Sequence, residues 1–556
     1  MRTVRALVTA AMATGVMFVD PVSARADDPH VMPIDPAAYD GSVAAEPTFG
    51  ASADPGDPTA TAGCGAAAPD PVPDGAPIVV RIGGAAPFTV GRISAATWKN
   101  PPVADPSWRL TFQGLMWMKS LARRAAQDGQ QQSLAALVAQ AAQFHRADPD
   151  PRTNAAGWDE GTALRRLETE NCLYSLTRAA ALIPGMSADA AVLLGKRYYG
   201  PPYAPVHNHG LMANLRLVRA GDLLGRPAWK STAVKRMTAE APLAFSRAGL
   251  SFEQSSGYQG VNANMWGQAA EVLAASPGAG AAAATLRKVV AKAWTAFAWE
   301  TEPDGNIVQI GDSEESAGRS VPRNWARTLR DDQTGTIVGR WSWSDRQTSY
   351  YTVRYGPPRR AHGQEDRAGG VTWSTLGSRV LVGPGKYNYD KNSPWNAYMI
   401  SPLSHNVAIP NGGAVKSGRT AKVKTALVQS SAHAWTIVDD IYNTPHTRNV
   451  NVSRDAHRMR VTDLFSRSTL WRQHWHLDPG WRLTSGKVGG TTVTFTNSAG
   501  RRLTVTTTGR VSGMVKGQTR PINGWHFAKF GSRVKATDLV IRSYGRGATV
   551  TTFTVR

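Results

Sequence analysis

The chain has 556 residues, of which 42% are hydrophobic and 19% charged, so it is neither a disordered tail nor a small disulfide-stapled scaffold. Lys and Arg outnumber Asp and Glu by 63 to 41, which gives a formal net charge of +22. A positive charge of this size does not define a fold, but it favours anionic partners such as nucleic acid, anionic lipid or acidic polysaccharide.

Residues 1–26 are typical of an export signal. Arg2 and Arg5 precede an apolar run at 6–19, and Ala24-Arg25-Ala26 offers a small-x-small cleavage site. The run is 14 residues long, whereas a membrane-spanning helix needs about 20. Since no later stretch is long enough either, we expect a secreted, extracellular protein without a membrane span.

Residues 27–75 are rich in Ala, Pro, Gly and Asp and contain few large apolar side chains. Such a segment cannot bury enough surface to offset its chain entropy, so we predict a disordered linker. The chain has two cysteines, Cys64 and Cys172, which excludes a zinc cluster or a disulfide framework. Whether these two pair outside the cell is left open.

Residues 76–330 are predicted to be helical. Apolar residues recur at helical spacing, for example at Leu134, Leu137, Ala141 and Phe144. Further segments of this type are expected near residues 163–182, 211–224, 233–247, 261–275 and 283–299, with Gly and Pro in the loops between them. A succession of helical hairpins of this length indicates a toroid or an α-solenoid.

Residues 331–556 change to a period of two. Segments rich in Thr, Val, Trp and Tyr alternate with Gly and Asn turns, at 336–343, 349–355, 371–382, 434–441, 491–496, 503–507 and 548–555. Helices followed by strands, without alternation, argue against a doubly wound sheet and favour an antiparallel sandwich. Residues 451–556 carry 18 Lys and Arg against 4 Asp and Glu, so an anionic polymer would suit this region.

Two polar clusters stand out in the helical half. His207-Asn208-His209-Gly210 begins an apolar helix, where exposed backbone N–H groups and Asn and His side chains suit a carboxylate. The alternative is that Asn208 merely caps the helix. The second cluster is the polar loop 252–258, which ends at Tyr258; a lone tyrosine is more often a half-buried core residue.

Three more clusters follow within the strand region, more than turns alone require. They are residues 361–366 with His362, the Gly- and Tyr-rich stretch 383–389, and Tyr398 with residues 403–406.

With these motifs in this order, the chain resembles the heparinase II/III-like family of polysaccharide lyases, which includes alginate and heparin lyases. The resemblance covers nearly all of residues 78–556 and also includes the Gly-Asp-Ser loop at 311–313. It implies a multidomain α plus β protein, with an N-terminal α/α toroid, an incomplete barrel, at 76–330, followed by a C-terminal antiparallel β-sandwich at 331–556.

The reaction that the resemblance implies is β-elimination on a uronic acid. The enzyme must neutralise the sugar carboxylate, remove the adjacent proton and protonate the leaving oxygen. By resemblance, Asn208 and His209 neutralise the carboxylate, Tyr258 transfers protons, His362 faces the cleft from the β domain, and Tyr398 is a second catalytic tyrosine. Which tyrosine is the base depends on syn or anti geometry, and the sequence leaves this open.

We further expect Glu253, Gln254, Arg360 and His405 to contact the substrate. Some family members hold a structural metal through a His-x-His pair, a later Asp and a further His. Here Gln364 and Gly383 stand at two of those positions, so we expect no metal and no cofactor. The pair His474-x-His476 lacks a third ligand and is more typical of packing positions.

Three alternatives compete with the lyase. An inverting glycoside hydrolase needs two carboxyls about 6.5–9.5 Å apart, and the candidates are Glu253, Asp312, Glu314 and Glu315. A non-catalytic secreted protein that binds acidic glycan would also suit the charge. Nucleic-acid binding is not expected, because no recognisable module is present. The sequence does not specify the polymer, endo or exo action, or the oligomeric state.

Overall fold

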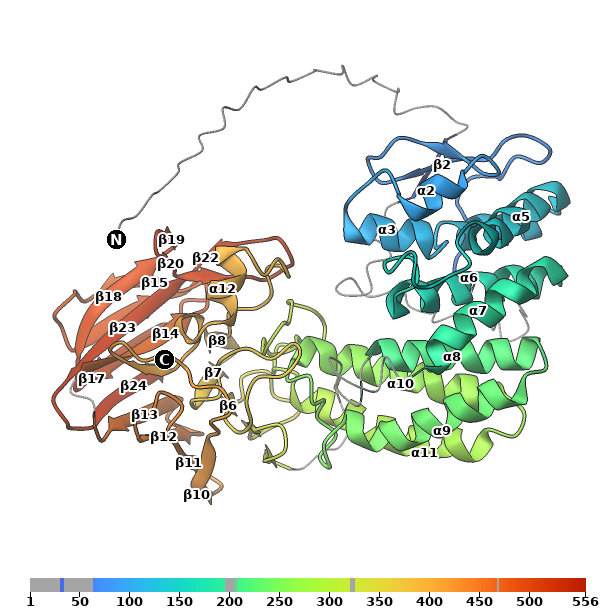
Figure 1. Cartoon of the computed structure of the whole chain (residues 1–556). Coiled ribbons are helices and arrows are strands. Elements are labelled where there is room, and N and C mark those ends of the chain that lie inside the picture. Colours follow the sequence, from blue (N-terminus) through green and yellow to red (C-terminus); the bar gives the residue numbers. More distant parts are fainter. Residues whose placement is uncertain (1–30, 35–63, 196–205, 207, 321–325, 468–469) are drawn as a thin grey trace, which may run out of the picture.

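The computed structural model of the chain describes residues 31–34, 64–195, 206, 208–320, 326–467 and 470–556. Figure 1 shows a helical domain beside a β domain, with the connecting loops between them. The predicted export signal, residues 1–26, lies outside the described residues. Within the described ranges, no helix combines the length and the apolarity that crossing a membrane requires.

The prediction of a disordered linker at 27–75 is wrong for part of that segment. Strand β1 (Val31–Ile34) pairs in parallel with β2 (Val79–Ile82), which also pairs with β3 (Phe88–Thr89). From Cys64 onward the chain packs on the helices: a disulfide joins Cys64 to Cys172, and the Val72 side chain is fully buried. A disulfide and a few buried apolar side chains attach residues 64–75 to the helices, although the composition there is that of a linker.

The helical domain is built from hairpins, as the apolar spacing predicts. Its helices are α2 (Ala95–Lys99), α3 (Pro106–Gln113), α4 (Met118–Gln127), α5 (Gln131–Ala147), α6 (Glu160–Thr177), α7 (Ile183–Leu194), α8 (Asn208–Leu223), α9 (Pro227–Ala244), α10 (Ser256–Ala275) and α11 (Gly280–Trp299). The pairs α8–α9 and α10–α11 stack side by side toward the β domain (Figure 1). Helices α6, α8 and α10 carry the predicted segments near 163, 211 and 261.

The β domain contains two large sheets packed face to face. One has the order β10-β11-β12-β13-β24-β17-β16-β15, and the other has the order β18-β23-β14-β8-β7-β6-β5-β4, with β9 paired to β14. Their strands are β4 (Thr328–Asp331), β5 (Thr336–Arg340), β6 (Tyr350–Arg354), β7 (Gly370–Thr375), β8 (Ser378–Leu381), β9 (Ala408–Pro410), β10 (Lys422–Val428), β11 (Ala432–Asp439), β12 (His446–Ser453), β13 (Arg458–Phe465), β14 (Leu470–Leu477), β15 (Arg482–Ser485), β16 (Thr492–Thr496), β17 (Arg502–Thr507), β18 (Arg510–Lys516), β23 (Thr537–Tyr544) and β24 (Thr549–Val555).

The core of the β domain lies between these two sheets. Strand β24 alternates buried and half-buried residues along its length, and β12 does the same. Trp373 from one sheet and Trp435 and Phe553 from the other meet in one apolar cluster. The predicted antiparallel sandwich after a helical domain is therefore confirmed.

The two domains meet where Gly311 crosses between them. Its φ is +61°, and a Cβ there would lie 2.4 Å from the carbonyl oxygen of Gln254 and 2.6 Å from that of His362. Only glycine accommodates both the backbone conformation and the space. The close approach brings the loop before α10, the 311–313 loop and the His362 loop of the β domain to one point. Nearby, the Tyr350 hydroxyl donates to the Trp299 carbonyl across the junction at 2.9 Å.

Candidate functional site

Tyr258 lies at this junction, in the first turn of α10. The Ser255 hydroxyl caps the helix by accepting a hydrogen bond from the Tyr258 backbone N–H at 3.3 Å. The phenol ring stacks on the His362 imidazole from the β domain, with ring centres 3.4 Å apart and planes within 4°. Tyr258 is therefore buried against a histidine of the other domain and not in the apolar core between helices.

A second tyrosine, Tyr389, completes this pair. Its hydroxyl lies 3.0 Å from the Tyr258 hydroxyl and 3.4 Å from Nδ1 of His362. Burial is the main cause that raises the pKa of Tyr389 well above the usual value of a phenol, and the neighbouring Tyr258 and Asp312 add to it. The Tyr389 hydroxyl therefore keeps its proton at neutral pH. Sequence reasoning marked the stretch 383–389 but did not select this residue.

Asp312 fixes the orientation of the His362 imidazole. Its Oδ2 lies 3.2 Å from Nδ1 of His362, and its Oδ1 accepts a hydrogen bond from Nε2 of Gln364 at 3.0 Å. The same Gln364 amide donates to the carbonyl oxygen of Gly385 at 3.1 Å. Because Nε2 faces two acceptors, the orientation of the Gln364 amide is determined, and its Oε1 points the other way.

His405 lies on that other side of Gln364. Its Nε2 is 3.1 Å from Gln364 Oε1, and its Nδ1 is 2.8 Å from the Ser401 carbonyl oxygen. The side chain is 4% exposed, and burial lowers the pKa of His405. This placement does not favour the predicted contact of His405 with substrate. The residue is instead the far end of a chain of hydrogen bonds that runs through Gln364 and Asp312 to His362.

Lys386 brings a positive charge to the two phenols. Its Nζ lies 5.1 Å from the centre of the Tyr389 ring and 5.9 Å from that of Tyr258. The lysine is 3% exposed and forms an ion pair with Glu314 at 3.4 Å. A buried ammonium group at this distance stabilises negative charge that develops on a phenol oxygen during proton transfer.

The carboxylates of the hydrolase alternative already have hydrogen-bond or ion-pair partners within the protein. The hydrogen bond from His526, together with Arg379, outweighs burial and lowers the pKa of Glu315 to about 2. Asp312 is bonded to His362, and burial raises the pKa of Glu253, which accepts a hydrogen bond from Asn262 at 2.9 Å. No specific feature of these side chains favours an inverting pair.

Asn208 and His209 begin α8, which packs beside α10, and one hydrogen bond joins the C-terminal ends of the two helices. At the C-terminal end, Asp222 of α8 accepts a hydrogen bond from Ser276 at the end of α10, at 2.6 Å. Asn208 lies 14 residues before Asp222 and Tyr258 lies 18 residues before Ser276, or about 21 and 27 Å along their helices. Both therefore lie at the helix ends that face the β domain.

Within this helix start, Asn208 is the first helical residue. Its side-chain Oδ1 accepts a hydrogen bond from the His209 N–H at 2.8 Å, and both side chains are partly exposed. His207, which the sequence places beside them, lies outside the described residues. Because Oδ1 bonds the backbone, Nδ2 is the atom of the Asn208 amide that can donate to a ligand.

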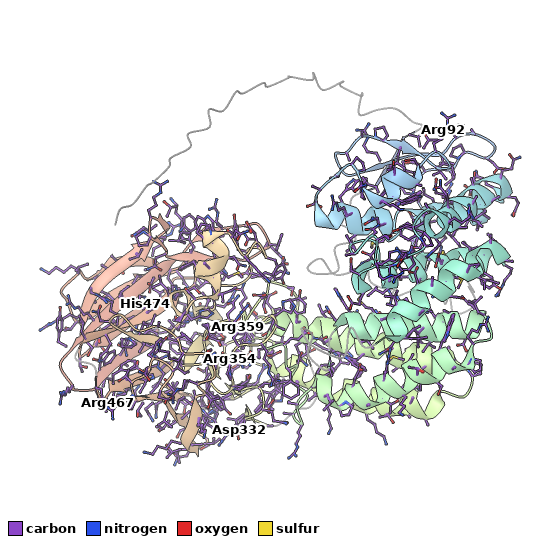
Figure 2. The ribbon with its side chains drawn as sticks, viewed as in Figure 1. Arg92, Asp332, Arg354, Arg359, Arg467 and His474 are labelled. Atoms are coloured by element: carbon purple, nitrogen blue, oxygen red, sulfur yellow. A yellow bond between two sulfur atoms is a disulfide. The ribbon has the colours of Figure 1, made fainter. Side chains whose placement is uncertain are left out.

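The remaining predicted substrate contacts divide into two kinds. Gln254 is 6% exposed, and its Oε1 accepts a hydrogen bond from the Arg360 backbone N–H at 2.7 Å, so it supports the loop. Arg360 is exposed, with its guanidinium 5.6 Å from the Phe252 ring centre. Figure 2 shows the neighbouring Arg359 where the β-domain loops approach the helices. Exposed cations at this junction suit an anionic polymer.

Tyr398 belongs to a different cluster from Tyr258. It lies on helix α12 (Pro394–Ile400), is 5% exposed, and packs with Met399 and Phe527. Its hydroxyl donates to Asn523 Oδ1 at 3.4 Å, and burial raises its pKa. Its role as the second catalytic tyrosine stays a prediction. Tyr389 is the tyrosine whose hydroxyl meets that of Tyr258.

In the β domain, the residues at the positions of the structural metal site of some heparinase II/III-like proteins do not suit a metal ion. At the position of the second histidine, Gln364 presents an amide N–H that is already shared between Asp312 and the Gly385 carbonyl. In the described ranges, one group of three potential ligands lies close together, namely His145, Glu170 and Asp189 in the helical domain. There the Arg166 guanidinium already forms an ion pair with Asp189, so one of the two carboxylates is neutralised without a metal ion.

Comparison with known proteins agrees with this architecture. Residues 337–554 match the model of the heparinase II/III-like C-terminal domain. That part of the chain is a heparinase II/III-like C-terminal domain. A comparison with curated proteins gives no significant match.

Solved structures extend the likeness to the helical domain. A mutant of the heparan sulfate lyase HepC from Pedobacter heparinus aligns with a TM-score of 0.66 and 16% identity, over 85% of this chain and 80% of that one. A heparinase III aligns with a TM-score of 0.65 and 13% identity, over 82% and 79% of the two chains. At this identity the likeness establishes the fold, and the predicted α/α toroid followed by an antiparallel β domain is confirmed.

Proposed function

We propose that this heparinase II/III-like protein is a secreted polysaccharide lyase that cleaves an acidic, uronic-acid-containing polysaccharide by β-elimination. The observation that carries the proposal is the Tyr258–Tyr389–His362 cluster at the domain junction, in which the Tyr389 hydroxyl lies 3.0 Å from the Tyr258 hydroxyl and 3.4 Å from His362 Nδ1. The likeness to a heparan sulfate lyase and to a heparinase III supports it.

The proposed reaction begins with the uronate carboxylate at the start of α8. The Asn208 amide and His209 donate hydrogen bonds to it, so that the adjacent C–H becomes acidic enough to lose a proton. Exposed N–H groups at a helix N-terminus add favourable electrostatics there. The product would carry an unsaturated uronate at its new non-reducing end.

The two tyrosines then divide the proton transfers. Tyr258 is proposed as the base and reacts as the phenolate, whose negative charge is stabilised by the nearby Lys386 ammonium and is lost when it takes the proton from the sugar. Tyr389, whose pKa is raised, keeps its proton and is suited to donate it to the leaving glycosidic oxygen. The proton that Tyr258 has taken up then passes to Tyr389 through their 3.0 Å contact, which restores both side chains. His362 stacks on the Tyr258 ring and holds it in place.

The charge of the chain is consistent with an acidic polymer. The net charge of +22 attracts a polyanion, and exposed Arg359 and Arg360 lie beside the proposed site. Secretion is proposed from residues 1–26. Finding the protein in the culture medium with its N-terminus at Asp27 would support secretion, whereas an intact N-terminus on intracellular protein would contradict it.

Replacement of one hydroxyl tests the mechanism. Tyr258→Phe keeps the ring that stacks on His362 but removes a proton-transfer group, so we expect turnover to fall by about 100-fold or more with the fold retained. Turnover is measured as the ultraviolet absorbance of the unsaturated product, and folding as the circular dichroism spectrum. Tyr544→Phe, at a tyrosine that is 60% exposed, is the matched control. An unchanged rate in Tyr258→Phe would remove this residue from the mechanism.

A further inference from the structure

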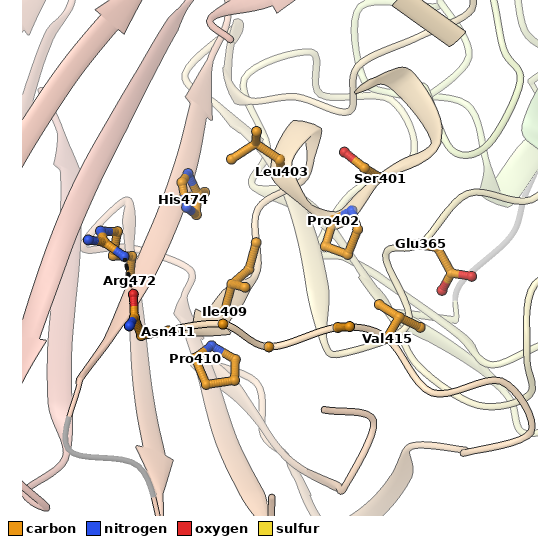
Figure 3. Close-up of a pocket in the computed structure, with 13 residues that line it drawn as sticks. Glu365, Ser401, Pro402, Leu403, Ile409, Pro410, Asn411, Val415, Arg472 and His474 are labelled. Carbon is orange, nitrogen blue, oxygen red and sulfur yellow. Dashed lines mark hydrogen bonds between the residues drawn. The ribbon is translucent and has the colours of Figure 1, made fainter. Parts of the chain in front are cut away.

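A second hollow lies in the β domain, on the other side of the loop that carries His362. It has a volume of about 460 Å³ and lies between residues 401–403, strand β9 with its following loop, and strand β14. Figure 3 shows its side chains converging from these segments. Glu365 lines this hollow while His362, three residues earlier, faces Tyr258. The loop that contains residues 362–365 therefore contributes one side chain to the candidate functional site and another to this hollow.

Strand β14 supplies two basic side chains to this hollow. Arg472 and His474 are two residues apart, so they lie on the same face of the strand, whereas Trp471 and Trp475 point into the sandwich core. Figure 3 shows both basic side chains facing the segment 403–410. His474 is the first histidine of the His-x-His pair, which the sequence does not explain by itself.

A buried carboxylate holds His474 in one orientation. Nδ1 of His474 lies 2.8 Å from Oδ2 of Asp538, which also accepts a hydrogen bond from Nδ2 of Asn523 at 2.8 Å. Asp538 is fully buried, and His474 is 6% exposed. Since Nδ1 carries the proton that bonds the carboxylate, Nε2 is the nitrogen on the pocket side.

The other walls suit the ring of a sugar. Pro402, Leu403, Ile409 and Val415 give an apolar surface, and Asn411 adds an amide beside Arg472. The acidic residue, Glu365, is already in an ion pair with Arg367 at 2.9 Å, so it does not cancel the positive side of the pocket. A mostly apolar hollow with a few convergent polar groups has the composition of a small-ligand site.

We propose that this hollow is an accessory site for one anionic sugar unit, whose carboxylate or sulfate contacts Arg472 and His474 while its ring lies on the Ile409 side. The anion follows from the pocket itself, and the saccharide rests on the proposed function. The site would hold a polymer chain or its product on the β domain, apart from the reacting bond.

Binding of small probes tests this without turnover. The probes are glucuronic acid, glucosamine 6-sulfate and neutral glucose, titrated at millimolar concentration into the full chain with ¹⁵N-labelled histidine. We expect saturable shifts of one histidine with at least one acidic probe and none with glucose. Binding of one acidic probe and not the other identifies the anion. If neither acidic probe binds, the proposal is overturned.

Single substitutions test whether the probes bind in this hollow. Arg472→Ala should weaken the binding about tenfold or more, because a hydrogen bond to a charged group is lost. Arg460→Ala, at an exposed arginine on β13, is the control and should bind as the wild type does. Tyr258→Phe should also bind normally, whether or not the chain is a lyase. Normal binding by Arg472→Ala, or loss of binding in Tyr258→Phe, would overturn the assignment.

Discussion

The hydrogen bonds that hold Asp312 make a quantitative prediction about Gln364. In Gln364→Leu the volume is nearly kept, but Asp312 Oδ1 and the Gly385 carbonyl lose their donor and His405 loses its acceptor. A hydrogen bond to a charged group contributes about 1.5–3 kcal/mol. If that energy serves to hold Asp312 on His362, its loss raises the barrier by the same amount, so kcat falls roughly 10- to 100-fold.

The assay separates positioning from stability. Gln364 contacts Asp312 and not the two tyrosine hydroxyls of the proposed site. We therefore expect KM to change little while kcat falls. Gln473→Leu is the matched control: Gln473 is a fully buried glutamine that donates to Asp463 at 2.7 Å, inside the β-sandwich core. That variant should lower the free energy of unfolding without lowering kcat. A wild-type kcat in Gln364→Leu would refute the positioning role.

Three further predictions follow from single features of the chain. Tyr389→Phe should lower kcat by about 100-fold if its proton completes the reaction, and an unchanged kcat in the absorbance assay would exclude it. Burial alone would lower the pKa of His446, but Asp439 and Asp463 outweigh it and raise the pKa to about 9, so its stabilisation is full below about pH 6.5 and is lost as the pH rises through 9. Urea unfolding should therefore show up to about 3 kcal/mol less stability above pH 9, in wild type but not in His446→Gln. The bond between Cys64 and Cys172 spans 108 residues of chain, so replacing both with Ser should cost about 4 kcal/mol of unfolding free energy, and equal stability would contradict a role for this bond.

The domain order could be predicted from the sequence because the periods of its apolar residues differ. Helices α8, α10 and α11 fall within a few residues of the predicted segments, since each has a clear apolar face and a breaker at its end. Strands such as β13 and β14 were not recognised. In β14 the alternation is obscured because Trp471, Gln473 and Trp475 are buried on one face while His474 and His476 are buried on the other.

The candidate site could be predicted only in part. Tyr258 and His362 were identified from their motifs, and the structure brings them into contact. Tyr389 was not selected, because nothing in the sequence distinguishes it from Tyr387 and the resemblance pointed to Tyr398. The path of the loop after Gly385, which brings the Tyr389 hydroxyl to that of Tyr258, could not be predicted from the sequence. Likewise, the sequence shows Gln364 at the position of a metal ligand but cannot show that its amide bridges two elements.

The same limit explains the linker prediction. Average composition between residues 27 and 75 indicates disorder, but ordering there depends on particular contacts. The disulfide of Cys64, and the hydrogen bond from the Ala68 N–H to the Ser120 carbonyl at 2.9 Å, attach the chain to helices that are distant in the sequence. Composition averages over a window and cannot register such contacts.

The most direct test of the central claim is the ultraviolet absorbance of the purified mature protein with a panel of uronate polysaccharides, namely alginate, heparan sulfate, chondroitin sulfate and hyaluronan. Elimination creates a conjugated double bond that hydrolysis cannot produce. We predict a rise in absorbance with at least one acidic polymer, which would also name the substrate class. New reducing ends without absorbance would identify a hydrolase, and neither signal across the panel, with polymer still bound, would identify a glycan-binding protein; either result would contradict the proposed lyase.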